Sequence, residues 1–165
     1  MNQFARTASL SMVLFSMTSV LATEPTEADY NRFREFLVGT WNWETQGFSG
    51  TITFTLSPTK RCLTSYASTN GGPVMHAIEG YDAEKKSWKR VLFWAQGGHA
   101  VAHTKIDTSA ARKSLNGLTL KGNVHDVDSD GRARDSKVTY RIVDKNKWEV
   151  HRQDGTIVYT RQKKK

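Results

Sequence analysis

The feature that most constrains this chain is a change of hydrophobic period at Gly39. Before Gly39, apolar residues recur every three or four positions, which is typical of an amphipathic helix. After it, apolar and polar residues alternate in short segments as far as residue 162. Alternation of this kind indicates strands with one buried face. One helix followed by a long series of strands predicts an all-β domain.

Turn residues divide the alternating region into about ten strand-like segments. We expect strands at 40–45, 50–56, 62–68, 74–81, 88–95, 100–107, 115–124, 133–143, 148–152 and 157–162. The turns are too short to hold crossover helices, so sequential strands should pair antiparallel in an up-and-down meander. An open sheet of this size exposes two strand edges, and closure removes them. Residues 39–165 are therefore predicted to form a closed or nearly closed barrel.

The N-terminal helix is expected within residues 23–38. Tyr30, Phe33, Phe36 and Leu37 recur at helical spacing there. A helix of about three turns is marginal by itself in water. It needs an apolar surface to pack on, and we expect that surface to be the barrel.

Residues 1–22 have the three parts of a secretory signal peptide. Arg6 supplies a positive charge, residues 8–21 an apolar stretch, and Ala22 a small residue after which cleavage is expected. The apolar stretch is shorter than the roughly 20 residues that span a bilayer. The residue after the expected cleavage point is Thr23, whereas a lipid-anchored protein would have cysteine there. We therefore expect an exported protein, periplasmic or secreted, without a stable membrane anchor.

The charge of the chain bears on its partners. Its formal net charge is +8, and part of it lies in the basic tail at residues 161–165. Such a field favours anionic partners. Nucleic acid is not an expected partner of an exported protein. Cys62 is the sole cysteine, so an intramolecular disulfide is excluded and the core must hold the fold.

The period of two also sorts side chains into an inner and an outer face. In five of the expected strands, the side chains that should point inward are Trp41, Trp43, Ile52, Phe54, Leu56, Val138, Tyr140, Ile142, Trp148, Val150, Ile157 and Tyr159. The inner face is expected to combine aromatic residues with a few basic ones. These candidate ligand-binding residues are Phe54, His76, Trp88, Arg90, Trp94, His103, Tyr140 and Arg152. In an apolar cavity, a few convergent polar groups orient a ligand, and arginine suits a carboxylate or phosphate. The pattern thus predicts a site for a small apolar or amphipathic ligand. This ligand can carry an anionic head group.

The start of the first strand carries a family resemblance. Gly39-Thr40-Trp41 after a short helix resembles the G-x-W signature of lipocalins, in the calycin superfamily. Gly80-Tyr81-Asp82 followed by Trp88 looks like a group of uncharacterised bacterial lipocalin-like domains. The resemblance implies a ligand-binding barrel with structural roles for Gly39 and Trp41. It also implies a late-strand arginine across the signature tryptophan, and Arg161 is similar in placement.

The chain departs from two related branches of that superfamily. Fatty-acid-binding barrels hold a carboxylate with an Arg-x-Tyr pair on the last strand, but the order here is Tyr159-Thr160-Arg161. Haem-binding barrels continue their tryptophan with alternating glycines, and this chain has Asn42-Trp43-Glu44. Neither feature is carried over, and no cofactor is expected.

Two segments superficially resemble metal sites. His99 and His103 are four residues apart, which on a strand is about 13 Å, too far for both imidazoles to bind one zinc at about 2 Å. Residues 126–131 match the first half of a calcium loop, but its twelfth position is Lys137 in place of glutamate. A hairpin turn explains the same aspartates. No metal site is predicted.

No nucleophile elbow or zinc-protease helix occurs in the sequence. Glu79 and Asp135 are the nearest candidates for acid–base chemistry. The sequence therefore favours a binding protein. The alternative is an interaction module whose barrel is filled by its own aromatic side chains and whose basic surface meets partners, and an enzyme is the third hypothesis.

Overall fold

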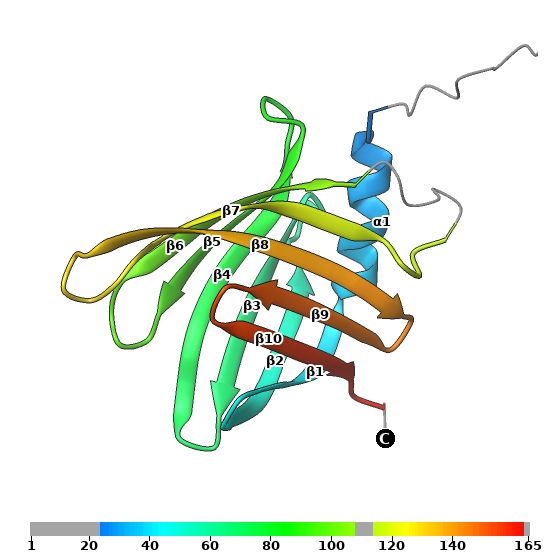
Figure 1. The fold of residues 1–165 in the computed structure, drawn as a ribbon. Coiled ribbons are helices and arrows are strands. Elements are labelled where there is room, and N and C mark those ends of the chain that lie inside the picture. Colours follow the sequence, from blue (N-terminus) through cyan, green and yellow to red (C-terminus); the bar gives the residue numbers. More distant parts are fainter. Residues whose placement is uncertain (1–23, 108–113, 164–165) are drawn as a thin grey trace, which may run out of the picture.

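The computed structural model describes residues 24–107 and 114–163, in which one helix is followed by ten strands. The elements are α1 (Glu27–Leu37), β1 (Gly39–Thr45), β2 (Phe48–Leu56), β3 (Cys62–Thr69), β4 (Gly72–Asp82), β5 (Ser87–Trp94), β6 (His99–Ile106), β7 (Thr119–Val127), β8 (Ala133–Asp144), β9 (Lys147–Arg152) and β10 (Gly155–Arg161). Consecutive strands pair antiparallel, and β10 also pairs with β1, so the sheet closes into a barrel (Figure 1). The predicted all-β meander with one N-terminal helix is confirmed.

The barrel closes where its first strand meets its last. Trp41 lies opposite Arg161, and Trp43 lies opposite Tyr159. On its other side β1 pairs with β2, which places Trp41 opposite Ile52. Directly opposed residues share one face of a sheet, and Trp41, Ile52 and Tyr159 are all buried. The inward faces predicted for β1, β2, β8, β9 and β10 are confirmed.

Helix α1 begins at a capping box. The Asp29 carboxylate accepts hydrogen bonds from the backbone N–H and the hydroxyl of Thr26 at 2.8 and 2.9 Å. The buried face of the helix includes Tyr30, whose hydroxyl donates to Lys86 O at 3.1 Å and accepts from Ile106 N at 3.2 Å. These bonds fix α1 across one end of the barrel. Within the described part of the chain, no helix has the length and apolarity to cross a bilayer.

Aromatic side chains fill the end of the barrel that α1 covers. Trp148 is almost completely buried and stacks on Tyr159, with ring centroids 3.9 Å apart. The rings of Trp41 and Phe54 lie edge-on to it at 6.3 and 6.2 Å. Such ring pairs add about 0.5–1.5 kcal/mol each beyond the burial of their area. This end is a packed core.

Arg161 joins α1 to the barrel. Its guanidinium lies 4.0 Å from the ring centroid of Trp41, as the lipocalin resemblance implied. It also donates hydrogen bonds to the carbonyls of Phe36 and Val38, at the C-terminal end of the helix. Those carbonyls have no partner inside the helix. The structural roles expected for Trp41 and Arg161 therefore have a geometric basis.

Most expected strand boundaries differ from the observed ones by three residues or fewer, and the largest difference is at the start of the seventh strand. The seventh strand begins at Thr119, whereas the alternation from residue 115 predicted an earlier start. Gly117 has φ of +79°, and Leu118 N donates to Leu115 O at 3.0 Å, so a turn occupies these residues. Isolated apolar residues in a turn can imitate a period of two. The signal peptide expected at residues 1–22 lies outside the described residues.

Candidate functional site

A cavity of about 150 Å³ lies inside the barrel, in the half away from α1. No residue of α1 contributes to its lining, which is mostly apolar. The lining residues are Trp43, Ile52, Ala67, Val74, Met75, Arg90, Leu92, Trp94, Ala102, Val124, Val138, Tyr140, Val150, Arg152, Ile157 and Tyr159. The barrel is therefore packed at one end and hollow at the other.

Four of the eight candidate ligand-binding residues line this cavity: Arg90, Trp94, Tyr140 and Arg152. Two more, Phe54 and Trp88, are buried but do not line it. Phe54 belongs to the ring cluster around Trp148, and Trp88 packs edge-on to Phe33 of α1 at 5.3 Å. Both residues therefore belong to the packed end.

The expected inward positions of His76 and His103 are wrong. In β4 the buried residues are Met75, Ala77 and Glu79, which leaves His76 exposed on the outer face. In β6 the buried positions alternate in the same way, and His103 lies on the outer face. Both strands carry apolar residues on both faces; Ile78, for example, is 57% exposed. Alternation alone could not decide which face is inward in these strands.

The sequence reasoning missed Tyr159, Trp43 and Met75 as cavity residues. Tyr159 and Trp43 were already expected to point inward, so their positions in the alternating pattern could have identified them as cavity residues. Met75 was not, because the phase of β4 was assigned the wrong way. Its thioether sulfur accepts a hydrogen bond from Arg90 Nη2 at 3.4 Å.

Arg90 is the buried charge of the cavity wall. It is 7% exposed, and its Nε lies 3.6 Å from Oε1 of Glu79, which is 4% exposed. Burial is the largest single effect and acts to lower the pKa of Arg90, but Glu79, Tyr140 and Tyr159 together outweigh it and hold that pKa above its ordinary value. Arg90 is therefore held as a cation, with the side-chain carboxylate of Glu79 beside it.

Glu79 is bonded to neighbours on both carboxylate oxygens. Trp88 Nε1 donates to Oε2 at 3.0 Å, and Ser65 Oγ donates to Oε1 at 3.3 Å. Glu79 does not line the cavity. Asp135, the other acid–base candidate, is exposed and bonded to His125 Nδ1 at 2.8 Å. The two carboxylates named as possible catalytic groups thus lie away from the cavity.

Two tyrosine hydroxyls accompany Arg90 at the cavity. Burial raises the pKa of Tyr159 to about 12, and the nearby Arg90 charge only partly opposes this effect. Burial also raises the pKa of Tyr140, again against the charge of Arg90. Both phenols are neutral at ordinary pH, so each can donate or accept a hydrogen bond.

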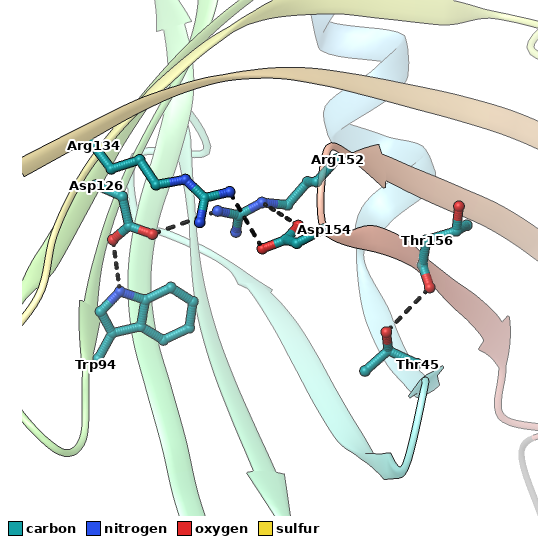
Figure 2. Close-up of polar contacts among 7 residues, drawn as sticks. All are labelled: Thr45, Trp94, Asp126, Arg134, Arg152, Asp154 and Thr156. Atoms are coloured by element: carbon teal, nitrogen blue, oxygen red, sulfur yellow. Dashed lines mark hydrogen bonds and ion pairs between the residues drawn. The ribbon is translucent and has the colours of Figure 1, made fainter.

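Charged side chains form a chain of contacts at the cavity mouth (Figure 2). Asp126 accepts from Trp94 Nε1 at 3.1 Å and from Arg152 Nη2 at 3.4 Å. Arg152 Nε lies 3.6 Å from Asp154 Oδ1, and Arg134 Nη2 lies 3.8 Å from Asp154 Oδ2. Arg134 and Asp154 are more than half exposed, so these outer contacts can exchange with water.

Beside the mouth, a hydrogen bond links the two strands that close the barrel. Thr45 Oγ1 on β1 donates to Thr156 O on β10 at 3.2 Å (Figure 2). The bond ties together the ends of the two strands beside the cavity.

The histidines and aspartates considered for metals have other surroundings. His99 and His103 lie on the single strand β6. Burial and the charges of Lys85 and Lys89 lower the pKa of His103, against the effect of Asp82. Asp128 accepts from Asp130 N and Arg132 N at 2.9 Å in the β7–β8 hairpin turn, which confirms the hairpin prediction. Among the described residues, no cluster of three or more acidic, histidine or cysteine side chains could hold a metal ion.

Comparisons with known proteins add no relative. No protein-family model matches the chain, and no curated protein matches it in sequence. The closed ten-stranded barrel is compatible with a calycin-like fold, and a barrel of this kind is consistent with ligand binding.

Proposed function

We propose that the protein is a lipocalin-like binding protein that holds a compact, mainly apolar molecule in the barrel cavity. The observation that carries the proposal is the contrast in packing along the barrel axis. One end is filled by aromatic rings and capped by α1, while the other encloses about 150 Å³ among apolar side chains. The alternative of a barrel filled by its own side chains describes only the α1 end.

The volume of the cavity restricts the ligand class. An apolar cavity of about 150 Å³ accommodates a benzene-sized molecule. Drug-sized ligands generally need about 300–1,000 Å³. The proposed ligand is therefore a single ring or a similarly compact apolar group, and a long-chain fatty acid is too large to be enclosed.

Hydrogen bonding at the cavity wall restricts the ligand further. The neutral hydroxyls of Tyr140 and Tyr159 lie where the cavity lining is otherwise apolar. A ring with one hydroxyl or carbonyl group can bond to them, whereas an ion placed beside the Arg90–Glu79 pair meets both a cation and an anion. Arg90 thus serves to shape and polarise the wall.

Two features support the wider assignment as an exported lipocalin-like carrier or sensor. The Arg161–Trp41 contact joins the last strand to the helix junction as in the family that the sequence resembles. The signal-peptide pattern at residues 1–22 favours export to the periplasm or the medium.

The test is isothermal titration calorimetry with benzyl alcohol, 4-methylphenol and palmitate, on the native chain and two variants. Ala102→Leu adds volume at the cavity wall, while Val101→Leu adds it on the outer face of the same strand. We expect one-site binding of the ring compounds, at least about tenfold weaker binding in Ala102→Leu, and no change in Val101→Leu, since the new side chain competes for the same space. Equal binding by the two variants, or binding of palmitate alone, would contradict the proposal.

A further inference from the structure

The barrel wall has a notch beside the cavity mouth, where β8 is longer than its neighbour β9. Pairing between these strands runs from Asp144↔Lys147 to Val138↔Arg152. Residues 133–137 of β8 extend beyond that last pair and have no strand neighbour on that side. Figure 1 shows the β7–β8 hairpin projecting past the β9–β10 hairpin. Part of the edge of β8 is therefore open.

A hollow of about 570 Å³ follows this open edge. Polar side chains make up its whole lining: Asn123, Asp135, Ser136, Lys137, Thr139, His151, Arg152 and Gln153. Arg152 also lines the interior cavity. The apolar cavity and the polar hollow thus meet at one side chain, so a single ligand can reach both.

Among the donors in this hollow that have no acceptor are groups of Ser136, Arg152 and Lys137. Ser136 is 8% exposed, and its buried Oγ makes no hydrogen bond. The buried Nε of Arg152 also makes none, since Asp154 Oδ1 is 3.6 Å away. In the described part of the chain, Lys137 forms no ion pair. An unsatisfied buried donor, such as Ser136 Oγ or Arg152 Nε, is costly, and a water, an ion or a ligand group bound beside it would remove that cost.

The acids near the hollow are already engaged. Asp135 is the one acidic residue in its lining, and it bonds to His125. Arg152 also has carboxylates beside it, but Asp154 is 54% exposed and its charge is screened by water. The Arg90 site is different, because Glu79 lies 3.6 Å from the guanidinium and is only 4% exposed. An anion at Arg90 would be repelled at short range by Glu79 in a poorly screened environment. Arg90 Nε and Arg152 Nε both lack a hydrogen bond, but the notch adds the unbonded hydroxyl of Ser136 and the ammonium group of Lys137.

We propose that the notch binds the anionic end of the ligand whose apolar ring occupies the cavity. The ligand class is then a compact ring joined by a short linker to a carboxylate, phosphate or sulfate. The anion accepts hydrogen bonds from Ser136 Oγ, Arg152 Nε and the ammonium group of Lys137. This inference rests on the proposed function, since it assigns the second half of the same ligand.

The experiment compares matched acids and alcohols by calorimetry. The probes are phenylacetate, 3-phenylpropionate, 4-phenylbutyrate and 5-phenylvalerate, each beside the alcohol of the same chain length. Lys137→Met and Ser136→Ala remove donors from the notch, and Lys89→Met removes an exposed lysine charge from β5 as the control. Amide chemical shifts of residues 134–137 and 152–153 report where the probe binds.

We expect an acid of one chain length to bind more tightly than its alcohol. Lys137→Met should weaken the binding of that acid about threefold to tenfold, because it removes a partly screened ion pair. The binding of the alcohol should be unchanged. Ser136→Ala should act in the same direction, and Lys89→Met should have no effect. Shifts at 134–137 and 152–153 should appear only with the acids.

Two results would overturn the inference in distinguishable ways. If the ring probes bind but acids are no better than alcohols, or their advantage survives in Lys137→Met and Ser136→Ala, the anion site fails and the cavity proposal stands. If no ring probe binds at all, the proposed function fails and the anion site fails with it.

Discussion

The two ends of this barrel are built from the same strands, but one end is packed with side chains and the other is hollow. At the α1 end, Trp41, Trp148 and Phe54 contact one another, and Arg161 ties the helix to the last strand. At the other end, inward side chains leave about 150 Å³ empty, and charged groups surround the mouth. We therefore expect the α1 end to contribute more to stability than the opposite end, where the cavity is available for a ligand.

The charged groups repeat this contrast. Arg90 and Glu79 are both less than a tenth exposed. Removal of one would leave the charge of the other buried without a partner. Arg134 and Asp154 are more than half exposed, so water compensates for the loss of either. Burial, more than the number of ion pairs, decides how much each contact matters.

The largest effect is expected from Trp148→Ala. The substitution empties the ring cluster, so we expect a loss of about 4 kcal/mol in the free energy of unfolding. Trp94→Ala, at the partly exposed mouth, should cost about 1 kcal/mol. Urea unfolding followed by circular dichroism measures both. Similar losses for the two tryptophans would erase the contrast between the ends.

Glu79→Gln should rank next. It leaves the Arg90 cation buried without its counter-ion, and the expected loss is about 3 kcal/mol. Adding Arg90→Met removes the stranded charge, so the double variant should be more stable than Glu79→Gln alone. A double-mutant cycle by denaturant unfolding measures the coupling. Additive losses would show that the pair does not act as a unit.

Arg161→Met should cost about 2 kcal/mol, since it removes the cation over Trp41 and the donors to two carbonyls of the helix end. Arg141→Met removes the same charge from the exposed outer face of β8 and is the matched control. Thermal unfolding compares them. If Arg141→Met were as harmful, the loss would reflect net charge and not the link to α1.

The smallest effect on stability is expected at the mouth. Arg134→Gln breaks an exposed ion pair with Asp154, which is worth less than about 0.5 kcal/mol. The unfolding midpoint in urea should be almost unchanged at low salt and at high salt. A loss as large as that of Glu79→Gln would show that the mouth contributes to the core.

The sequence predicted the barrel because its strands and turns are local patterns. It also predicted the inner faces of β2 and β8, since Ile52 and Phe54 alternate with threonines, leaving one apolar face. The phase of β4 was ambiguous, because Val74 and Ile78 alternate with Met75 and Ala77. Local sequence cannot resolve such a strand, and its neighbours decide which face is buried.

The site was less predictable than the fold. Arg90, Trp94, Tyr140 and Arg152 were identified from their phase, and the structure brings them to one cavity. The volume of that cavity depends on how rings from several strands pack, which no single segment encodes. The notch depends on β9 being shorter than β8 and on the register between them, and register is a property of the assembled sheet.

The most direct test of the account is a crystal soaked in 4-bromophenol, with anomalous data collected at the bromine absorption edge. The account predicts a bromine peak inside the cavity, among the side chains of Tyr140, Tyr159 and Ile157. Ala102→Leu crystals under the same conditions should lack that peak. Bromine sites confined to the outer face of the barrel would contradict the claim that the open end is a ligand site.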